Sequence, residues 1–375
     1  MIPNSRQNIS QEDIDEVVRV LKSSHLTQGK EVELFEEAIC DYIGCKYAVT
    51  FSSATSALLA AYSVVGIQEG DEVITTPISF VATSNMFVTL GAKPVWCDVK
   101  LDGNIDERFL ERLITPKTKA IVPVDFAGKP VEIHKINEIA KKHNLLVLQD
   151  SSHAFGSSID GKKIGTFADM TIFSFHAIQP LTTGEGGCVV TDSEEFAEKL
   201  RLFRSHGMVK KQLWTSDMVS MGYNFRLTEL AAALGRSQLK RLDSFLATRD
   251  KIAAYYDEQF KGHKLFSTVK LKENTRSSRH LYPIVLSPGL QCPKEDIFAE
   301  LQDRGIGVQV HYRPIYQNSF YQERFGETHL HVSDDFYRSE ISIPCHQEMS
   351  LQDAKFVADT LLEVIEKYSY RGCSF

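Results

Sequence analysis

The sequence predicts an α/β protein with a large, mostly parallel sheet domain followed by a smaller α/β domain. Short β-rich segments alternate with helical segments between residues 47 and 150, as in "KYAVTFSS", "ATSALLAAYSVVG", "DEVITT" and "FVATSNMFVTLG". Such alternation is typical of βαβ units, in which helices join parallel strands. The chain has 375 residues, enough for two separate hydrophobic cores.

The order of the predicted elements indicates where the two domains meet. Two helices open the chain: Ser10 and Asp13 form a capping box before the first, and Gly44 ends the second. After His153, the runs "MTIFSFH" and "GGCVVTDS" predict strands that finish the sheet at one edge. The segment "LTELAAALGRSQLKRLDSFLATRDKIAAYYDEQF" predicts a helix long enough to bridge two domains. We therefore expect a large domain at residues 1–245 and a small one at residues 246–375.

The composition of the chain restricts which partners and which cellular compartment we expect. The chain carries 42 basic and 49 acidic residues and has no basic block, which argues against nucleic acid as a partner. Its polar N-terminus and the lack of a long apolar run predict a cytoplasmic protein without membrane contact. Seven cysteines without a CxxC pair favour neither a disulfide framework nor a metal site.

Two polar positions follow predicted strands and suit an anionic cofactor. In "SSATSALLAA" a strand ends and a helix begins, so the free N–H groups and the Thr55 hydroxyl form a candidate phosphate site, although Ser and Thr are also ordinary helix caps. Asp150 ends the apolar strand "LLVLQD", where a buried carboxylate needs a cation, a hydrogen-bond network or a ligand. A helix cap is the alternative role for Asp150. Together the two positions suit pyridoxal phosphate, which has a phosphate at one end and a protonated ring nitrogen at the other.

A pyridoxal phosphate site also needs a flat neighbour and a lysine. Phe80 is a candidate stacking residue, although an aromatic side chain at such a turn is more often part of the core. The lysine is expected after a strand, in a setting such as "FSFHAIQPLTTGEGG" at residues 173–187. That segment carries Gln179 instead.

Motifs spread over essentially the whole chain resemble one enzyme family. They include "LTQGKEVELFEEAI", "TTPISFVATSN", "DSSHAFGS", "GYNFRLTELAAALGRSQL" and "GVQVHYRPIY", together with the segment around Gln179. The sequence resembles the DegT/DnrJ/EryC1/StrS sugar-nucleotide aminotransferases, which are fold-type I pyridoxal phosphate enzymes with an aspartate aminotransferase-like architecture. In that family the position of Gln179 is normally the lysine that forms a Schiff base with the cofactor.

The resemblance implies roles for individual cofactor-binding residues. Asp150 would pair with the pyridine nitrogen, Phe80 would stack on the ring, and His153, where many members have glutamine, would lie near the ring hydroxyl. The residues implied for the phosphate are Ala54, Thr55 and Ser174, with Asn224 reaching it from a partner subunit. The family therefore also implies a homodimer with shared active sites.

Within the family, the likeness is greatest to the aminotransferases of pseudaminic acid biosynthesis, through "DFAGKPVEI", "RSHGM", "RHLYPI" and "QVHYRPIYQ". This implies that L-glutamate donates an amino group to C4 of UDP-2-acetamido-2,6-dideoxy-β-L-arabino-hex-4-ulose. Candidate residues for the sugar nucleotide or glutamate are Lys30, His206, Arg226, His311 and Tyr312. For each histidine, a structural hydrogen bond is an equally good interpretation.

Gln179 leaves three interpretations of the activity. The amide nitrogen of glutamine is neither nucleophilic nor basic, so Gln179 cannot replace the lysine in chemistry. The chain is then a Lys→Gln variant of an aminotransferase that accumulates the external aldimine, which we favour because the other motifs are intact. The alternatives are a natural lysine-less sugar dehydratase, with His176 or His206 as base, and a non-catalytic protein that binds a sugar nucleotide.

Overall fold

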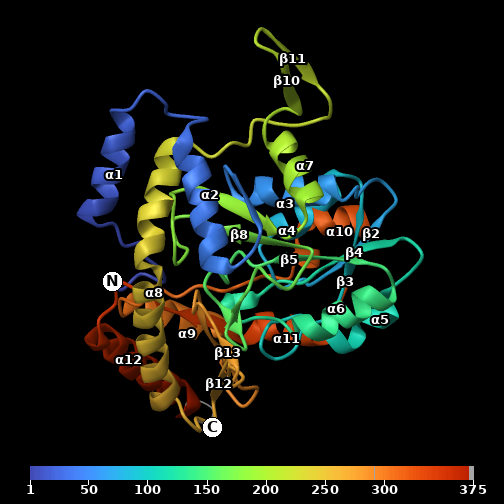
Figure 1. Ribbon diagram of the computed structural model, residues 1–375. Helices are drawn as coiled ribbons and strands as arrows, with labels where there is room; N and C mark the ends of the chain where they lie inside the picture. The colour runs from blue at the N-terminus through green and yellow to red at the C-terminus, as the bar shows by residue number, and fades with distance from the viewer. Residues whose placement is uncertain (291, 371–375) are drawn as a thin grey trace.

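A seven-stranded sheet forms the centre of the computed structural model, which describes residues 1–290 and 292–370 (Figure 1). In spatial order its strands are β1 (Tyr47–Phe51), β9 (Gly187–Thr191), β8 (Met170–Ser174), β5 (Leu146–Asp150), β4 (Thr118–Val122), β2 (Glu72–Thr75) and β3 (Lys93–Trp96). Neighbouring strands are parallel except at β9, which runs antiparallel to both β1 and β8. The predicted mostly parallel sheet is confirmed.

The position of β9 corrects one expectation. We expected the two strands after His153 to finish the sheet at one edge, but β1 is the edge strand and β9 lies inside it. All five residues of β9 are buried. Gly187 permits this, because a Cβ atom there would lie 2.6 Å from the backbone nitrogen of Ala54. Apolar patterning predicted the strands, but strand order depends on such close approaches.

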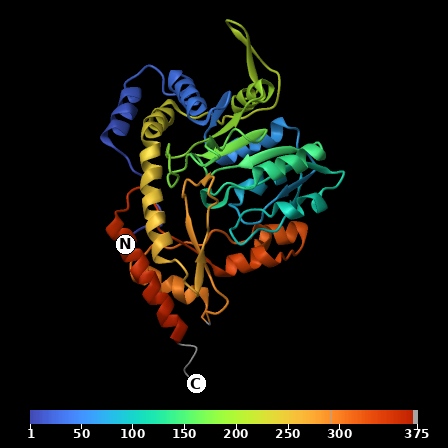
Figure 2. The same ribbon diagram turned by 60° about the horizontal axis from the view of Figure 1, so that its bottom comes forward.

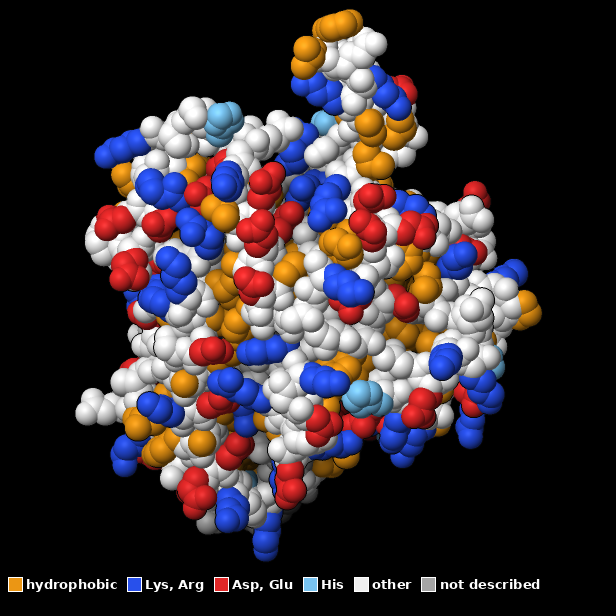
Figure 3. All heavy atoms as spheres, viewed as in Figure 1, with side chains coloured by type: hydrophobic (Ala, Val, Ile, Leu, Met, Phe, Trp, Pro, Cys, Tyr) orange, Lys and Arg blue, Asp and Glu red, His pale blue; other side chains and the backbone are white. Residues whose placement is uncertain are grey.

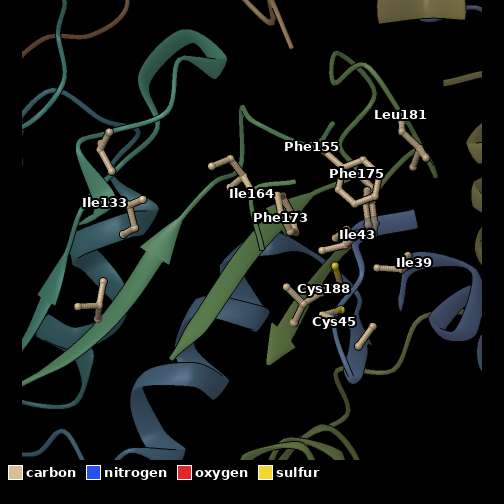
Figure 4. Packing of buried hydrophobic residues seen from close by; sticks show 14 of the residues in the cluster. Ile39, Ile43, Cys45, Ile133, Phe155, Ile164, Phe173, Phe175, Leu181 and Cys188 are labelled. Carbon is tan, nitrogen blue, oxygen red and sulfur yellow. The ribbon is translucent and has the colours of Figure 1, made fainter. Parts of the chain in front are cut away.

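Helices cover both faces of the sheet, and alternate residues of each strand face different layers. In β4, Ile121 packs in a cluster with Ile136 of α6 (Ile133–Lys142), whereas Val122 packs with Leu58 of α3 (Ala54–Val64). The second layer also contains α4 (Ala82–Thr89) and α7 (Glu194–Arg204), and the short helix α5 (Leu110–Leu113) precedes β4. Figure 4 shows part of the first cluster, with Phe155, Phe173 and Phe175 above Ile39 and Ile43.

Three helices form one side of the molecule: α1 (Gln11–Leu21), α2 (Lys30–Ile43) and the long α8 (Glu229–Gln259) (Figure 1). The predicted capping box is confirmed, because the Ser10 hydroxyl accepts from Asp13 N at 3.3 Å and Asp13 Oδ2 accepts from Ser10 N at 2.9 Å. Gly44 ends α2 with φ of 87°, as predicted. Asp13 also accepts from Gln238 Nε2 at 2.7 Å, which joins α1 to α8.

The C-terminal part has its own sheet and core (Figure 2). Strands β12 (Phe266–Thr268), β14 (Tyr282–Leu286) and β15 (Glu340–Ile343) are antiparallel, and α9 (Lys294–Asp303) and α12 (Leu351–Tyr370) pack beside them. Two further helices contact the large-sheet part: Tyr321 of α10 (Ser319–Phe325) bonds to Ser84 of α4, and Phe336 of α11 (His331–Ser339) packs on Phe126. Along α8, core side chains change from the first cluster to this one between Leu246 and Ile252. The boundary at residue 245 stays a prediction.

Several short strands were not predicted. A small sheet joins β6 (Ser158–Ile159), β7 (Lys162–Lys163) and β13 (Thr275–Arg276). A hairpin of β10 (Met208–Gln212) and β11 (Thr215–Met218) projects from the body of the molecule (Figure 1). Its residues are mostly exposed, so they lack the alternating burial that makes a strand visible in sequence. Within residues 1–290 and 292–370, no helix is long and apolar enough to cross a membrane.

Arg249 joins α8 to the C-terminal part, and substituting it tests how much this connection contributes to stability. This buried side chain donates to the carbonyls of Arg279 and Cys345 at 3.0 and 2.7 Å, and burial lowers its pKa to about 10. We expect Arg249→Met to reduce the free energy of unfolding by roughly 3 kcal/mol, because these carbonyls are left buried without a donor. Urea unfolding checks this. The control Lys251→Met, at an exposed position of α8, should reduce the free energy of unfolding by less than about 0.5 kcal/mol. Equal effects of the two changes would contradict this role of Arg249.

Candidate active site

A cavity of about 380 Å³ lies at the carboxyl ends of β5 and β8. Asp150 is the last residue of β5 and Ser174 the last of β8, and both line the cavity. Parallel strands commonly present ligand sites at this edge. The predicted site residues that line it are Ala54, Thr55, Phe80, Asp150, His153, Ser174, Gln179 and Tyr312.

Asp150 is a buried carboxylate held by hydroxyl and amide donors. Its side chain accepts from Thr83 Oγ1 at 2.7 Å, from Ser152 Oγ at 2.6 Å and from Ser152 N at 3.1 Å. Burial raises the pKa of Asp150, and these donors partly oppose that rise. No cation pairs with it in the part of the chain that the structure describes. A buried carboxylate of this kind favours a cationic hydrogen-bond donor as its ligand.

The N-terminus of α3 forms another part of the cavity lining. Ser53 caps this helix by accepting from Ser56 N at 3.1 Å, and the capping box is reciprocal. The next two residues, Ala54 and Thr55, line the cavity at the positive end of the helix. The cavity therefore contains both a buried acid and the N-terminus of a helix.

Aromatic and imidazole rings form the remaining walls. Phe80 is 58% exposed, so it is not a core residue, and its ring centroid lies 6.3 Å from that of Tyr312. His153 Nε2 lies 3.1 Å from the Tyr312 hydroxyl, and the His153 ring lies 4.4 Å from the ring of His280. Burial lowers the pKa of His153 to about 3 and also lowers the pKa of His280. Both imidazoles are therefore neutral at physiological pH.

Gln179 lies in the same cavity, after β8. Its side chain is buried, and its Oε1 atom is without a hydrogen-bond partner among the described residues. The backbone N–H of Gln179 donates to the carbonyl of His176 at 2.9 Å, which closes the turn that presents the side chain. A buried, unpartnered amide oxygen in a cavity points to a ligand that supplies a donor.

The remaining predicted residues lie outside this cavity. Lys30, His206 and Asn224 are exposed, and Asn224 pairs with Ser205 through the backbone. Arg226 lines a separate hollow of about 220 Å³, together with Arg204. His311 is half-buried and immediately precedes Tyr312. In one chain, therefore, the cofactor-type residues other than Asn224 assemble, whereas Tyr312 is the one substrate-type residue that lines the cavity.

Sequence reasoning missed three cavity residues that the fold supplies. Thr83 and Ser152 donate to Asp150, and His280 stacks against His153. Ser152 stands two residues after Asp150, a common spacing for such a side-chain contact, so it was accessible from the sequence. Thr83 comes from α4 and His280 from the C-terminal part, and only tertiary packing brings them here.

The neutral state of His153 predicts how stability responds to acid. Its pKa falls from the ordinary value of 6.5 to about 3, so below pH 6.5 the unfolded chain binds a proton that the folded protein does not. Stability should therefore fall as the pH decreases from 6.5. Between pH 7 and pH 5 the free energy of unfolding should fall in the unchanged protein. In His153→Gln this fall should be smaller by roughly 1–2 kcal/mol. Urea unfolding at both pH values measures this; identical losses would refute a neutral His153.

Comparisons with known proteins identify the family of this chain. Residues 7–362 match the model of the DegT/DnrJ/EryC1/StrS aminotransferase family. The chain is 52% identical to a UDP-4-amino-4,6-dideoxy-N-acetyl-beta-L-altrosamine transaminase of Campylobacter jejuni, over 100% of both chains.

Solved structures show the same relationship. The Helicobacter pylori PseC, an aminotransferase involved in the biosynthesis of pseudoaminic acid, superposes with a TM-score of 0.95 at 47% identity, over 98% of this chain and 100% of the other. The Streptococcus pneumoniae protein Spr1654 in its PMP form superposes with a TM-score of 0.94 at 31% identity, over 98% of this chain and 100% of the other. Family match, identity and fold agree over nearly the whole chain, and the protein is therefore a member of the DegT/DnrJ/EryC1/StrS aminotransferase family.

Proposed function

We propose that this protein binds pyridoxal phosphate in the 380 Å³ cavity and acts on UDP-linked sugars, as an aminotransferase scaffold. The observation that carries the proposal is the assembly, in one cavity, of a buried Asp150, the N-terminus of α3 and the exposed ring of Phe80. These groups match the ring nitrogen, the phosphate and the flat face of that cofactor. When bound, pyridoxal phosphate supplies an electron sink for the carbon that exchanges its amino group.

Each wall of the cavity has its own task toward that cofactor. Asp150 accepts from the protonated ring nitrogen, and Thr83 and Ser152 hold its carboxylate in place. Ala54, Thr55 and Ser174 hold the phosphate, and Phe80 lies against the ring. The neutral His153, held by Tyr312, has a buried Nδ1 without a partner among the described residues, and this atom would be available to the ring hydroxyl.

The substrates we propose are a UDP-linked 4-keto-6-deoxy-N-acetylhexosamine and L-glutamate, as in the pathway of the Campylobacter and Helicobacter relatives. Arg226 supports this, because its buried Nε atom lacks a partner among the described residues. Its guanidinium and that of Arg204 line the smaller hollow, although Arg204 already pairs with Glu36. A guanidinium suits phosphate or carboxylate oxygens. Lys30, His206, His311 and Tyr312 remain further proposed substrate contacts.

Gln179 separates binding from turnover. It fills the lysine position without a nucleophilic amine or a basic group, so it neither attaches the cofactor nor moves a proton. Its buried Oε1 still offers an acceptor to a bound ligand. The protein as it stands is thus an aminotransferase scaffold that holds its ligands without converting them.

Restoring the amine tests this proposal. We expect Gln179→Lys to raise amino transfer from L-glutamate to the UDP-linked keto sugar by ~10²–10⁴-fold, the range typical of a positioned acid–base group. Formation of 2-oxoglutarate measures the rate. Borohydride treatment with pyridoxal phosphate should add the cofactor mass to this variant alone.

The matched control is Gln179→Arg, which adds a positive charge without a nucleophilic amine. It should show neither 2-oxoglutarate formation nor the mass increase. An inactive Gln179→Lys that nevertheless binds cofactor would sink the aminotransferase proposal.

A second candidate function follows from His176. This residue lines the cavity three positions before Gln179, whereas His206, the other imidazole considered, lies outside it. A lysine-less dehydratase would use His176 as the base. Incubation of the unchanged protein with keto sugar and pyridoxamine phosphate would then give a sugar that has lost a hydroxyl group. Tight sugar-nucleotide binding with neither reaction would instead indicate a binding protein.

We also propose that two copies assemble into a homodimer with shared sites. Asn224, Lys30 and His206 lie outside the cavity of their own chain, where a second copy would meet them. The projecting hairpin carries apolar side chains at its tip, including Leu213 and Trp214 at 86% and 81% exposure (Figure 3). Exposed aromatic anchors of this kind are typical of protein interfaces.

If the hairpin takes part in the dimer interface, a charged residue at its tip should weaken the dimer. A buried interface tryptophan commonly contributes at least about 2 kcal/mol, so Trp214→Glu should weaken association by roughly 30-fold or more. Light scattering during size-exclusion chromatography should show twice the 42.3 kDa chain mass for the unchanged protein and a concentration-dependent fall for the variant. Leu101→Glu, at a position 78% exposed elsewhere, serves as the control. Unaltered association of the Trp214 variant would remove the hairpin from the interface.

A further inference from the structure

A second buried carboxyl group, Glu340, lies beside the cavity and is not used by the proposed function. Glu340 and Ser342 stand two residues apart on β15, so their side chains share one face of the strand, and both are fully buried. The segment before His311 pairs with this strand: Gln309 N donates to Ser342 O at 3.1 Å, and Ser342 N donates to Gln309 O at 2.8 Å. The backbone thus holds His311 against both side chains.

Three hydrogen bonds connect these groups. The backbone N–H of His311 donates to Glu340 Oε2 at 2.8 Å. Ser342 Oγ lies 2.5 Å from Glu340 Oε1 and 2.9 Å from His311 Nδ1. The serine hydroxyl has one proton, so it can donate to only one of these two neighbours. Its direction decides the state of both.

Two arrangements satisfy all three bonds. When Glu340 is ionised, Ser342 donates to Oε1 and accepts from His311 Nδ1–H, so His311 Nε2 has a free lone pair. When Glu340 carries a proton on Oε1, it donates to Ser342, and Ser342 donates to His311 Nδ1. The imidazole proton of His311 then lies on Nε2.

The surroundings favour the second arrangement at neutral pH. Burial raises the pKa of Glu340 to about 8, and burial lowers the pKa of His311 to about 4. Lys294 of α9 is the cation that opposes the rise at Glu340, but it donates to the Tyr337 carbonyl, and no salt bridge to Glu340 forms within the described residues. Tyr312, His153 and His280 are the other titratable groups within electrostatic range.

We propose that Glu340 and Ser342 are positioning residues that set which ring nitrogen of His311 carries the proton. The inference rests on the proposed function only in that His311 meets the substrate. When an acceptor oxygen takes the Nε2 proton, the Ser342 proton moves to Nδ1 and the Glu340 proton moves to Ser342. Glu340 becomes ionised, His311 stays neutral, and no other group gains or loses a proton.

The tautomer of His311 is directly measurable in the unchanged protein. Long-range ¹H–¹⁵N correlation of protein labelled with ¹⁵N-histidine distinguishes Nδ1–H from Nε2–H, and loss of one signal set in His311→Gln assigns the residue. We expect Nε2–H at pH 6.5 and a change to Nδ1–H as the pH rises through about 8, where Glu340 ionises. A single tautomer from pH 6 to 9.5 would overturn the proposal.

Two variants distinguish proton transfer along the Glu340–Ser342–His311 hydrogen-bond chain, here called the relay, from a purely structural role of these side chains. In Glu340→Gln the amide oxygen accepts from His311 N–H, so its NH₂ group faces Ser342, and His311 should keep Nε2–H at every pH. Ser342→Ala interrupts the relay without touching the carboxyl group, and it should also abolish the switch, which covers the case in which Glu340→Gln fails to fold. Glu300→Gln, which removes a carboxylate of α9 that pairs with Lys367 instead, should leave the switch intact. A switch that persists in either relay variant refutes the inference, whatever the outcome of the Gln179→Lys assay.

Discussion

The desolvated carboxylate of Asp150 is the constraint on which the rest of the site depends. Its position at the end of β5 is costly to bury, and the protein offsets part of that cost with hydroxyl donors from Thr83 and Ser152. Those donors come from α4 and from the turn after β5, so the acid fixes where both segments lie. Because no cation pairs with Asp150 among the described residues, the cavity favours a ligand that brings a cationic hydrogen-bond donor.

Another wall of the cavity comes from the C-terminal part of the chain, which hydrogen bonds join to α8. Tyr312 and His280 belong to the C-terminal part, yet both face the cavity. Arg249 of α8 binds the carbonyl groups of Arg279 and His280, so the long helix positions the imidazole wall as well as the C-terminal sheet. The site therefore depends on contacts between the two parts of the chain, such as the packing of Tyr312 against the cluster that joins Phe126 with Phe336.

Gln179 places a neutral amide inside an otherwise assembled cavity. The turn after β8, the helix N-terminus and the buried acid are all present around a side chain that has no reactive nitrogen. Nothing in the packing collapses around the amide, because glutamine and lysine have comparable reach.

Much of this could be predicted from the sequence, because local patterns are set by local physics. Period-two and period-3.6 apolar spacing predicted the strands and helices, and the capping box at Ser10 and the stop at Gly44 were read correctly. Asp150, Thr55 and Phe80 were found because strand ends and strand-to-helix turns are visible in the chain. The placement of β9 inside the sheet, the donor Thr83, the ring of His280, the exposed hairpin and the Glu340 hydrogen-bond chain were not predictable. Each depends on contacts between residues far apart in sequence, and those contacts are decided by close packing and by where buried polar groups find partners, which exist only in the folded structure.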